Sequence, residues 1–189
     1  MEIEIRDIEK NEYEKTFNFV KRIFMKYEAP DYSEEGVNSF IQSVMYNREY
    51  QDSLKVYGAF CEDKLVGVIA TRNSGNHIAL FFVEGTYHRQ GIGKKLFRHV
   101  LRNNTIGRIT VNSSPYAVEV YHHLGFIDTD KEQITDGVRY TPMVYECPCK
   151  HNKCENHNNC ILCREKHSSK KRKPACEREK RRGGLWRRK

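Results

Sequence analysis

The sequence lacks any long apolar segment. Its 189 residues contain no run of about 18 consecutive apolar residues, the length that a membrane-spanning helix needs, so we expect no membrane partner. The first residues, MEIEIRDIEK, also lack the cationic start and the apolar core of a secretory signal peptide. Both absences favour a cytoplasmic protein.

The balance of positive and negative charge differs sharply between two parts of the chain. Residues 1–146 hold 18 Lys and Arg against 21 Asp and Glu, whereas residues 147–189 hold 15 against 4. Six of the seven cysteines lie in the second part. We therefore expect one domain over residues 1–146, a cysteine-rich module over residues 147–176 and a disordered basic tail over residues 177–189. Such a tail can bind nucleic acid by releasing counterions.

The first part alternates between helical and strand patterns. Apolar residues recur three or four positions apart in the predicted helices. Isoleucine alternates with charged residues in the first predicted strand, and most of the later ones are runs rich in β-forming residues. This order predicts a mixed α/β (α+β) fold with much antiparallel pairing. The helices are expected at 13–27, 33–47, 92–103 and 114–126, and the strands at 1–8, 53–61, 65–73, 77–83, 107–112 and in a hairpin over 133–146 that turns at Asp136-Gly137.

Two phosphate-binding motifs are incomplete in HRQGIGKKLF, residues 88–97, which joins a predicted strand to a cationic helix. A dinucleotide-binding fingerprint needs glycine where Leu96 stands, and a P-loop needs glycine at His88 and a hydroxyl at Lys95. The glycines still allow an anion to approach the free N–H groups of the first helical turn. The stretch therefore predicts a pyrophosphate site, with an ordinary strand-to-helix turn as the alternative.

Two stretches together carry a family resemblance. Residues 88–93 read H-R-Q-G-I-G, and further on Asn112, Ala117 and Tyr121 precede the run Leu124-Gly125-Phe126. In this order and spacing they resemble the acetyl-coenzyme A motifs of the GNAT superfamily of N-acetyltransferases. The resemblance covers roughly residues 1 to 147, and it departs from the family pattern at His88, where Gln or Arg is usual.

The resemblance implies a mostly antiparallel sheet flanked by helices, in which the parallel strands 77–83 and 107–112 splay apart. The pantetheine arm of acetyl-coenzyme A would enter this gap, and the amides from Arg89 to Lys95 would bind the pyrophosphate. An N–H group aimed at the thioester oxygen would stabilise the charge that develops there. The residues expected to bind the cofactor are Phe82, Val83, His88, Arg89, Gln90, Gly91, Ile92, Gly93, Lys94, Lys95 and Asn112.

The implied reaction transfers an acetyl group to a primary amine of a small molecule or a peptide. Tyr121 is the expected general acid for the leaving thiolate, and a packed aromatic beside Phe126 is its alternative role. Glu84, directly after a strand, is the nearest candidate for the general base, although the amine can also lose its proton by pre-equilibrium. Other carboxylates, in the segment that borders the acceptor site in relatives, are Glu28, Asp31, Glu34 and Glu35.

The cysteines of the second part follow the spacing C-x-C-x4-C-x5-C-x2-C-x3-H. Cytoplasmic thiols stay reduced, so this spacing favours metal coordination over disulfides. Zinc fits four such ligands, and a two-metal or iron–sulfur arrangement would use more of them. A metal that folds the module is favoured over a catalytic one. The expected ligands are Cys147, Cys149, Cys154, Cys160, Cys163, His167 and Cys176.

Two functions from different classes fit these features. The first is an acetyl-coenzyme A-dependent N-acetyltransferase whose cysteine-rich appendage is structural or recruits substrate. The second is a binding module, in which a catalytically idle fold of this type uses a metal-stapled basic tail to dock on nucleic acid or another polyanion. The glycine turn, Asn112 and Tyr121 favour the enzyme.

Overall fold

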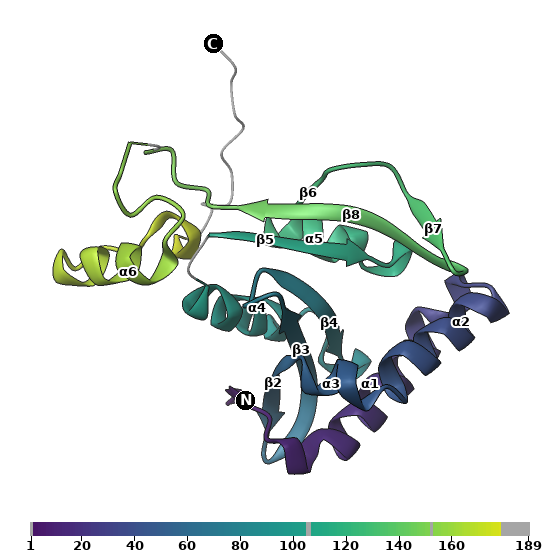
Figure 1. Ribbon diagram of the computed structural model, residues 1–189. Helices are drawn as coiled ribbons and strands as arrows, with labels where there is room; N and C mark the ends of the chain where they lie inside the picture. Colours follow the sequence, from purple (N-terminus) through teal and green to yellow (C-terminus); the bar gives the residue numbers. More distant parts are fainter. Residues whose placement is uncertain (1, 105–106, 152, 179–189) are drawn as a thin grey trace.

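A computed structural model describes residues 2–104, 107–151 and 153–178 (Figure 1). Its centre is an eight-stranded sheet in the order β1-β2-β3-β4-β5-β8-β6, with β7 paired to β8. Every strand pair is antiparallel except β4 and β5, which confirms the predicted mixed, mostly antiparallel fold. The strands are β1 (Glu4–Asp7), β2 (Lys55–Cys61), β3 (Lys64–Arg72), β4 (His77–Val83), β5 (Arg108–Ser113), β6 (Ile127–Asp128), β7 (Gln133–Thr135) and β8 (Val138–Glu146).

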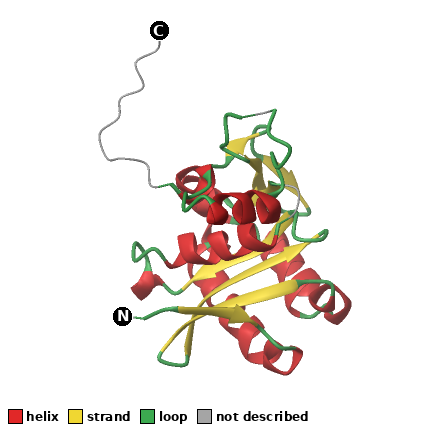
Figure 2. Cartoon of the chain, turned by 90° about the vertical axis from the view of Figure 1, so that its left-hand side faces the viewer, coloured by secondary structure: helices red, strands yellow, loops and turns green. Residues whose placement is uncertain are grey.

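Helices cover both faces of the sheet (Figure 2). The first three helices pack on one apolar face, and α4 and α5 pack on the other. No helix in the described part of the chain has the length and apolarity that crossing a bilayer requires. The α-helices are α1 (Tyr13–Tyr27), α2 (Glu34–Phe40), α3 (Arg48–Asp52), α4 (Ile92–Asn103), α5 (Val118–Leu124) and α6 (Cys160–Ser169), and the shorter turns are η1 (Lys10–Glu12), η2 (Ala29–Asp31), η3 (Ile41–Met45), η4 (Gly85–Tyr87), η5 (Pro115–Ala117) and η6 (Ala175–Glu177).

Helix α1 forms where the sequence predicts it, because its apolar residues recur at helical spacing. Phe17, Val20 and Phe24 are at most 5% exposed. The helix ends at Glu28, whose backbone N–H donates to the Phe24 carbonyl at 2.9 Å. Pro30 cannot continue the helix. Glu28 therefore lies where the chain turns away from α1.

Helix α2 also starts as predicted, with the Ser33 hydroxyl accepting a hydrogen bond from the Gly36 N–H at 3.2 Å. It is shorter than expected, because the chain continues as the π-helical turn η3. Gly36 sits against the turn between β7 and β8, where a Cβ atom would lie only 2.1 Å from the Gly137 carbonyl oxygen. The glycine that weakens the helix in the sequence pattern therefore permits a close contact between two backbones.

Strands β4 and β5 splay apart, as predicted. They pair only at His77 with Thr110 and at Ile78 with Val111. Beyond Ile78, β4 continues to Val83 with β3 as its partner on the other side. The edge of β4 that faces β5 is therefore open at the end that leads to α4, as Figure 1 shows.

The helices after β4 and β5 begin differently from each other. Helix α4 covers the predicted residues and starts from Gly91, whose φ of +80° glycine adopts without strain. The helix predicted over residues 114–126 is instead the turn η5 followed by the shorter α5, which ends at Gly125 with φ of +103°. Pro115 fits the first position of η5, and the left-handed glycine ends α5.

The cysteine-rich segment folds back onto the domain, which the sequence did not indicate. It forms α6, capped by the Asn159 side chain, which accepts from the Leu162 N–H at 3.0 Å. Helix α6 packs against α4, and a Cβ atom on Gly107 would lie 2.6 Å from the Cα of Asn158. The predicted basic tail falls mostly on residues 179–189, which lie outside the described residues.

Candidate active site

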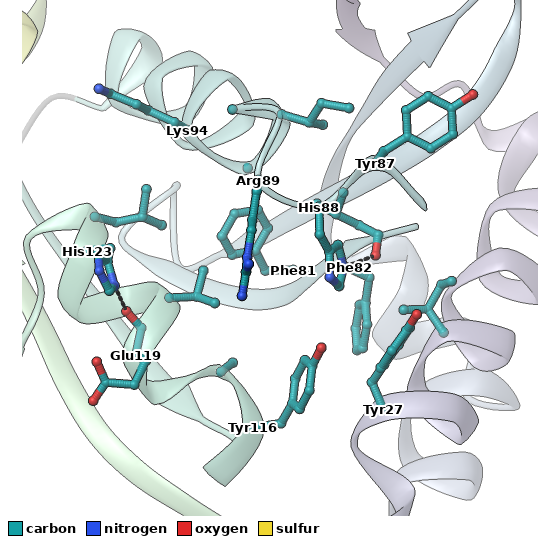
Figure 3. Close-up of a pocket in the computed structure, with 18 of the residues that line it drawn as sticks. Tyr27, Phe81, Phe82, Tyr87, His88, Arg89, Lys94, Tyr116, Glu119 and His123 are labelled. Carbon is teal, nitrogen blue, oxygen red and sulfur yellow. Dashed lines mark hydrogen bonds between the residues drawn. The ribbon is translucent and has the colours of Figure 1, made fainter. Parts of the chain in front are cut away.

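A cavity of about 720 Å³ lies where the end of α1, the end of β4, the turn before α4 and the start of α5 meet (Figure 3). Phe81 and Val120 contribute apolar wall, whereas Glu28, Arg89 and Lys94 bring charge to it. The open edge of β4 leads into this space. The cavity thus joins a helix N-terminus to an unpaired strand end.

The turn before α4 offers unpaired backbone amides. The Lys95 N–H is the first in the helix with a helical acceptor, the Gly91 carbonyl, at 3.0 Å. The amides of residues 92–94 come before it, and no helical carbonyl precedes them to accept their hydrogen bonds, as at any helix N-terminus. All three of these residues line the cavity, and the helix dipole adds positive potential there.

The two glycines of the turn serve different purposes. A Cβ atom on Gly91 would meet nothing within 4 Å, so the positive φ, and not space, requires glycine at this position. A Cβ atom on Gly93 would lie 3.1 Å from the Phe81 ring. Gly93 therefore allows α4 to pack closely on β4, a role that the motif alone does not reveal.

His88 ties the turn to the end of β4. Its Nε2 donates to the Val83 carbonyl at 2.9 Å, and its ring lies 5.5 Å from that of Tyr27 between centroids (Figure 3). The Tyr27 hydroxyl in turn packs against Gly85, where a Cβ atom would collide with it. The imidazole thus supports the loop where the family pattern has Gln or Arg.

Most of the residues expected to bind the cofactor share this cavity. The structure places Phe82, Val83, His88, Arg89, Gly91, Ile92, Gly93 and Lys94 on its wall. Gln90, Lys95 and Asn112 are not part of the wall: the Gln90 side chain donates to the Thr86 carbonyl at 2.9 Å, and Asn112 is exposed on β5. The sequence did not single out several other wall residues, since no motif marks them: Ile23, Phe81, Tyr87, Tyr116, Glu119 and Val120.

Tyr121 is buried at the core side of α5. It is 4% exposed, and its ring centroid lies 5.1 Å from that of Phe126 and 5.8 Å from that of Phe81. Burial raises the pKa of the Tyr121 phenol well above its ordinary value, and the Glu28 carboxylate adds to the shift. The phenol is therefore protonated at neutral pH and lies close to Glu28.

Glu28 is a carboxyl group of the cavity wall. Burial raises its pKa to about 7, with the neighbouring Ser114 hydroxyl opposing the shift and Asp31 adding to it. The Ser114 hydroxyl is itself 6% exposed and forms no hydrogen bond of ordinary length and angle among the described residues. Glu28 is thus close to half protonated at neutral pH.

Glu84, the predicted general base, forms an ion pair and caps a helical turn. Its side chain forms an ion pair with Arg22 and accepts from the Gly85 N–H at 3.1 Å, which caps η4. The Arg22 guanidinium holds the pKa of this carboxyl below its ordinary value. Neither Glu84 nor Tyr121 is part of the cavity wall, and the role of Glu84 as a base stays a prediction.

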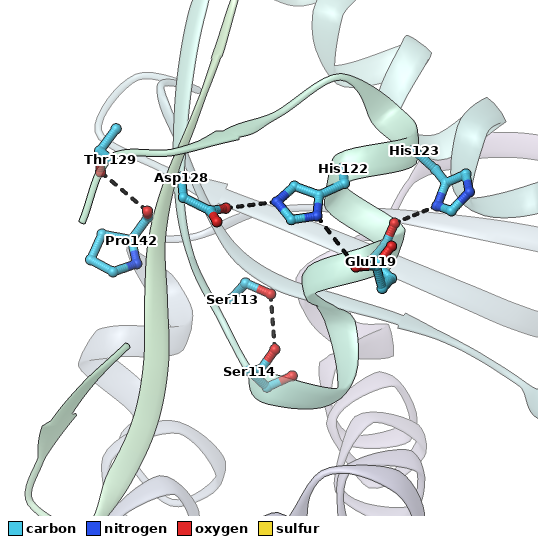
Figure 4. Close-up of polar contacts among 8 residues, drawn as sticks. All are labelled: Ser113, Ser114, Glu119, His122, His123, Asp128, Thr129 and Pro142. Atoms are coloured by element: carbon cyan, nitrogen blue, oxygen red, sulfur yellow. Dashed lines mark hydrogen bonds and ion pairs between the residues drawn. The ribbon is translucent and has the colours of Figure 1, made fainter. Parts of the chain in front are cut away.

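Two adjacent histidines on α5 make surface contacts (Figure 4). His122 pairs with Asp128 at 2.7 Å, and this carboxylate, with a smaller effect from Glu119, raises the pKa of the imidazole. His123 donates from Nδ1 to the Glu119 carbonyl at 2.6 Å. The pair of His122 with Asp128 ties α5 to β6, and the His123 contact lies within α5, so both imidazoles have structural partners.

Five of the expected metal ligands gather at one place. A small cavity is lined by Cys147, Cys149, Cys160, Cys163 and Cys176, all as free thiols. Within the described ranges, however, no three Cys, His, Asp or Glu side chains are close enough to hold a metal ion. The predicted zinc-binding module is therefore not supported by the described structure.

Comparison with known protein families identifies one that matches most of this chain. Residues 28–147 match the family described as the acetyltransferase (GNAT) domain. No curated protein sequence is significantly similar to the chain.

Several solved structures share the fold. A GCN5-related N-acetyltransferase from Rhodopseudomonas palustris has a TM-score of 0.63 at 18% identity and covers 77% of this chain and 96% of its own. The PaiA N-acetyltransferase of Thermoplasma acidophilum, solved with coenzyme A, has a TM-score of 0.58 at 21% identity, with coverage of 77% and 99%. The apo form of YjaB from Escherichia coli has a TM-score of 0.60 at 22% identity, with coverage of 77% and 98%.

At these identities the solved structures show a common fold, whereas the family match spans more than half of the chain. The motifs, the splayed strands and the glycine turn agree with that match. The chain belongs to the GNAT family of acetyltransferase domains.

Proposed function

We propose that this protein is an N-acetyltransferase that transfers the acetyl group of acetyl-coenzyme A to a primary amine of a small molecule or a peptide. The observation that carries the proposal is the cavity at the splayed end of β4, with unpaired helix amides on one wall and the helix of Tyr121 on another. Membership of the GNAT family and the coenzyme A complex of the PaiA relative support the donor substrate.

The pyrophosphate of the donor would bind at the start of α4. The amides of residues 92–94 donate to its oxygens, and the side chains of Arg89 and Lys94 add formal charge. The positive φ at Gly91 sets the direction of these amides. The Lys95 amide is already used inside the helix, so the cradle is shorter than the sequence suggested.

The acyl arm would run along the open edge of β4. Phe82 and Val83 offer main-chain groups there, and Asn112 would reach the arm from β5. The Val83 carbonyl already accepts a hydrogen bond from His88, so only its second lone pair is available to the acyl arm. An N–H group at this edge would face the thioester oxygen and stabilise the charge that develops as the amine attacks.

Tyr121 would act as general acid to the leaving sulfur. A thiol has an ordinary pKa of about 8.5, below that of the buried phenol, so complete proton transfer from Tyr121 needs an accompanying proton gain. The nitrogen that is becoming an amide supplies it as the C–S bond breaks. Tyr121 thus carries a proton between the nitrogen and the sulfur.

An amine screen tests the proposed function. Acetyl-coenzyme A should raise the melting temperature of the chain, and thiol release should follow with at least one member of a panel of polyamines, aminoglycosides, aromatic monoamines and peptides. Calorimetry that detects no binding of coenzyme A would contradict the proposal. Binding without thiol release from any amine would favour the idle binding module instead.

For the cysteine-rich segment we propose a structural metal site. The support is that five cysteines from three separate stretches of this segment line one cavity of about 10 Å³, which has room for about one water-sized atom. Small rotations of the thiols would have to bring them to bonding distance. Nucleic-acid binding by the basic tail and a cytoplasmic location stay predictions.

Elemental analysis tests this second proposal. The purified chain should contain about one equivalent of zinc or iron, and a chelator should lower its melting temperature. Substitution of Cys160 by Ser should reduce the metal content, whereas substitution of Cys61, which is buried in the other part, should not. A metal-free chain of unchanged stability would overturn the proposal.

A further inference from the structure

We propose that Glu28 is the general base of the acceptor site, which takes a proton from the ammonium group of the incoming amine. The inference rests on the proposed acetyltransferase function and deepens it, since it names the group that activates the acceptor and the charge of that acceptor. It replaces Glu84, the candidate that its position after β4 had suggested.

The place of Glu28 in the fold comes first. The residue stands at the end of α1, where the helix ends and the chain turns into η2. From there it forms part of the cavity wall that also includes Phe82, Arg89 and Tyr116. An amine that reaches the open edge of β4 from the α1 side therefore meets this carboxyl.

The surroundings of Glu28 link it to the catalytic helix. Burial is the main cause that raises the pKa of the Tyr32, Tyr116 and Tyr121 phenols, and Glu28 adds to the shift in each case. The carboxyl therefore lies near all three rings, which come from the loop after η2, from η5 and from α5. Glu28 therefore lies close to the expected general acid, although the Tyr121 side chain itself is not part of the cavity wall.

No cation neutralises Glu28. Within the described part of the chain, Glu12 pairs with Arg6 and Glu84 pairs with Arg22, but no Lys, Arg or His pairs with Glu28. Burying a carboxylate without a charged partner is costly, so such a group is unusual outside functional sites. The vacant position is suited to an ammonium ion of the acceptor.

A second polar group points to the same spot. The Ser114 hydroxyl is more than nine-tenths buried and lies close enough to the Glu28 carboxyl and the Tyr32 phenol to lower the pKa of both, but among the described residues it forms no hydrogen bond of ordinary length and angle. Figure 4 shows Ser114 at the end of β5, where the Ser113 hydroxyl donates to the Ser114 carbonyl at 2.9 Å. The free hydroxyl can bond the amine nitrogen or the carboxylate once an acceptor is present.

The proton balance follows from these positions. The Glu28 carboxylate takes one proton from the ammonium, and the neutral amine then forms the C–N bond to the thioester carbonyl. The electron pair of the breaking C–S bond leaves with sulfur, which takes the Tyr121 proton. The nitrogen gives its second proton to the Tyr121 oxygen, and Glu28 releases the first one to solvent. The products are the amide, the thiol and one proton.

The titration of Glu28 depends on the ionisable groups that lie near it. Asp31, from η2, raises the pKa of Glu28 and so favours its protonated form. The other titratable or charged groups on the same cavity wall are His88, Arg89, Lys94, Glu119 and His123. The phenols of Tyr32, Tyr116 and Tyr121 stay neutral through neutral pH. A base with a pKa of about 7 is well matched to proton transfer at neutral pH.

The same wall indicates the class of acceptor. Tyr27 and Tyr116 stack with their ring centroids 5.4 Å apart beside Glu28, and Ile23 and Val120 add apolar surface. Aromatic faces next to a carboxylate suit an ammonium group on an apolar or aromatic body. The acceptor is thus a cationic primary amine of this kind, bound through its charge and its adjacent carbon chain.

The decisive experiment is a pH profile of kcat/KM for the wild type and for Glu28→Gln, with the best amine of the screen. The wild type should lose activity below about pH 7, as Glu28 becomes protonated, and the variant should be at least about 100-fold slower at neutral pH and lack this limb. Its defect should shrink toward high pH, where the free amine is supplied by solvent. Coenzyme A affinity should stay within about twofold.

Matched variants separate a base from a structural role. Glu14→Gln, which changes an exposed carboxyl in the first turn of α1, at the other end of the helix from Glu28, should keep the wild-type rate and profile. Glu28→Asp should retain the acid limb at a reduced rate, since the carboxyl is kept. The Glu28→Gln defect should be smaller with the β,β-difluoro analogue of the same amine, because a much larger share of this weakly basic analogue is neutral at pH 7.

Three results would decide against the inference. If Glu28→Gln keeps the wild-type rate and its acid limb, Glu28 is not the base, although the proposed function stands. If the defect is equal for the two amines at every pH, Glu28 has only a structural role. If the wild type releases no thiol with any amine, the proposed function fails and this inference fails with it. Should the Gln variant not fold, the wild-type profile and the Asp variant still carry the test.

Discussion

At the residue scale, the site depends on the buried Tyr121 and the half-buried Glu28, which have opposite roles. Tyr121 keeps its proton because it is buried, whereas Glu28 can lose its proton near neutral pH. The two groups are close enough for the carboxylate to affect the phenol. Pairs of groups whose environments separate their pKa values are a recurring arrangement for acid and base roles.

Replacing Tyr121 by Phe should lower kcat by about 100-fold while leaving coenzyme A affinity nearly unchanged. The ring packs against Phe81 and Phe126, and Phe keeps that packing while it removes the proton. Steady-state kinetics and calorimetry on the same sample measure both quantities. An unchanged kcat would leave Tyr121 with its packing role alone.

Glu28 should also make stability depend on pH. Burial raises its folded pKa from 4.5 to about 7, so the folded state holds a proton that the unfolded state has lost between these values. Its favourable contribution is fully present below pH 4.5 and is lost as the pH rises through 7. Glu28→Gln cannot ionise, so its stability relative to the wild type should increase by about 2 to 3 kcal/mol between about pH 5 and about pH 8.

Chemical denaturation at several pH values measures this difference. Glu35→Gln, an exposed carboxyl in the neighbouring helix, serves as the control and should show no such trend. A constant difference between Glu28→Gln and the wild type across the range would mean that Glu28 is ionised at ordinary cost, which would also weaken its assignment as a base near neutral pH.

At the element scale, the glycine in the first turn of α2 allows a contact between distant segments. In an open helix, replacing Gly by Ala stabilises the fold by about 1 kcal/mol. At Gly36 the new Cβ atom would lie 2.1 Å from the Gly137 carbonyl oxygen. Because this oxygen belongs to the backbone, it cannot rotate away as a side chain could. Gly36→Ala should therefore destabilise the chain by about 1 to 3 kcal/mol, the usual range for overpacking.

Thermal and urea unfolding measure the sign as well as the size of this change. Asn38→Ala, at an exposed position of the same helix, should be neutral or slightly stabilising, because it gains helix propensity without a clash. A stabilising Gly36→Ala substitution would show that the hairpin turn does not rest on α2.

The elements with strong periodicity could be predicted, and those fixed by contacts could not. The apolar stripe of α1 and the two β-rich runs of β2 and β3, separated by Glu62-Asp63-Lys64, identify these elements from the sequence. The π-helical turn η3, the short α3 and the two-residue β6 have no pattern of their own, because tertiary packing determines them. Helix α6 was missed for a related reason, since charged residues and cysteines dominate its sequence.

The candidate site also contains residues that a motif predicts and residues that only tertiary contacts reveal. The glycine turn, His88 and Tyr121 are found by motif because backbone geometry and chemistry restrict those positions. The role of Gly93 against Phe81 and the pairing of Glu84 with Arg22 join residues far apart in the sequence, so no local pattern shows them. Burial is also invisible in one sequence, and burial is what distinguishes Glu28 from its acidic neighbours.

At the scale of the whole molecule, the chain is a GNAT domain with a helical appendage on one end of α4. The solved relatives cover about three quarters of this chain but nearly all of their own lengths. The appendage contacts α4 and the turn at Gly107, which follows the end of that helix. The cofactor turn lies at the opposite end of α4, at Gly91.

This arrangement predicts that stability and cofactor binding respond differently to removal of the appendage. Ending the chain at Glu146 would expose the surface of α4 that α6 covers and would remove the buried Cys160 from its place near Tyr145. Each kcal/mol lost lowers the melting temperature of a chain of this size by about 2 to 4 °C, and a loss of several degrees is expected. Coenzyme A affinity should change by less than about threefold, because the binding turn lies at the far end of the helix. If truncation abolished coenzyme A binding in a chain that still unfolds cooperatively, α6 would have to act on the cofactor turn through α4, and the appendage would be part of the binding machinery instead of a support for the fold.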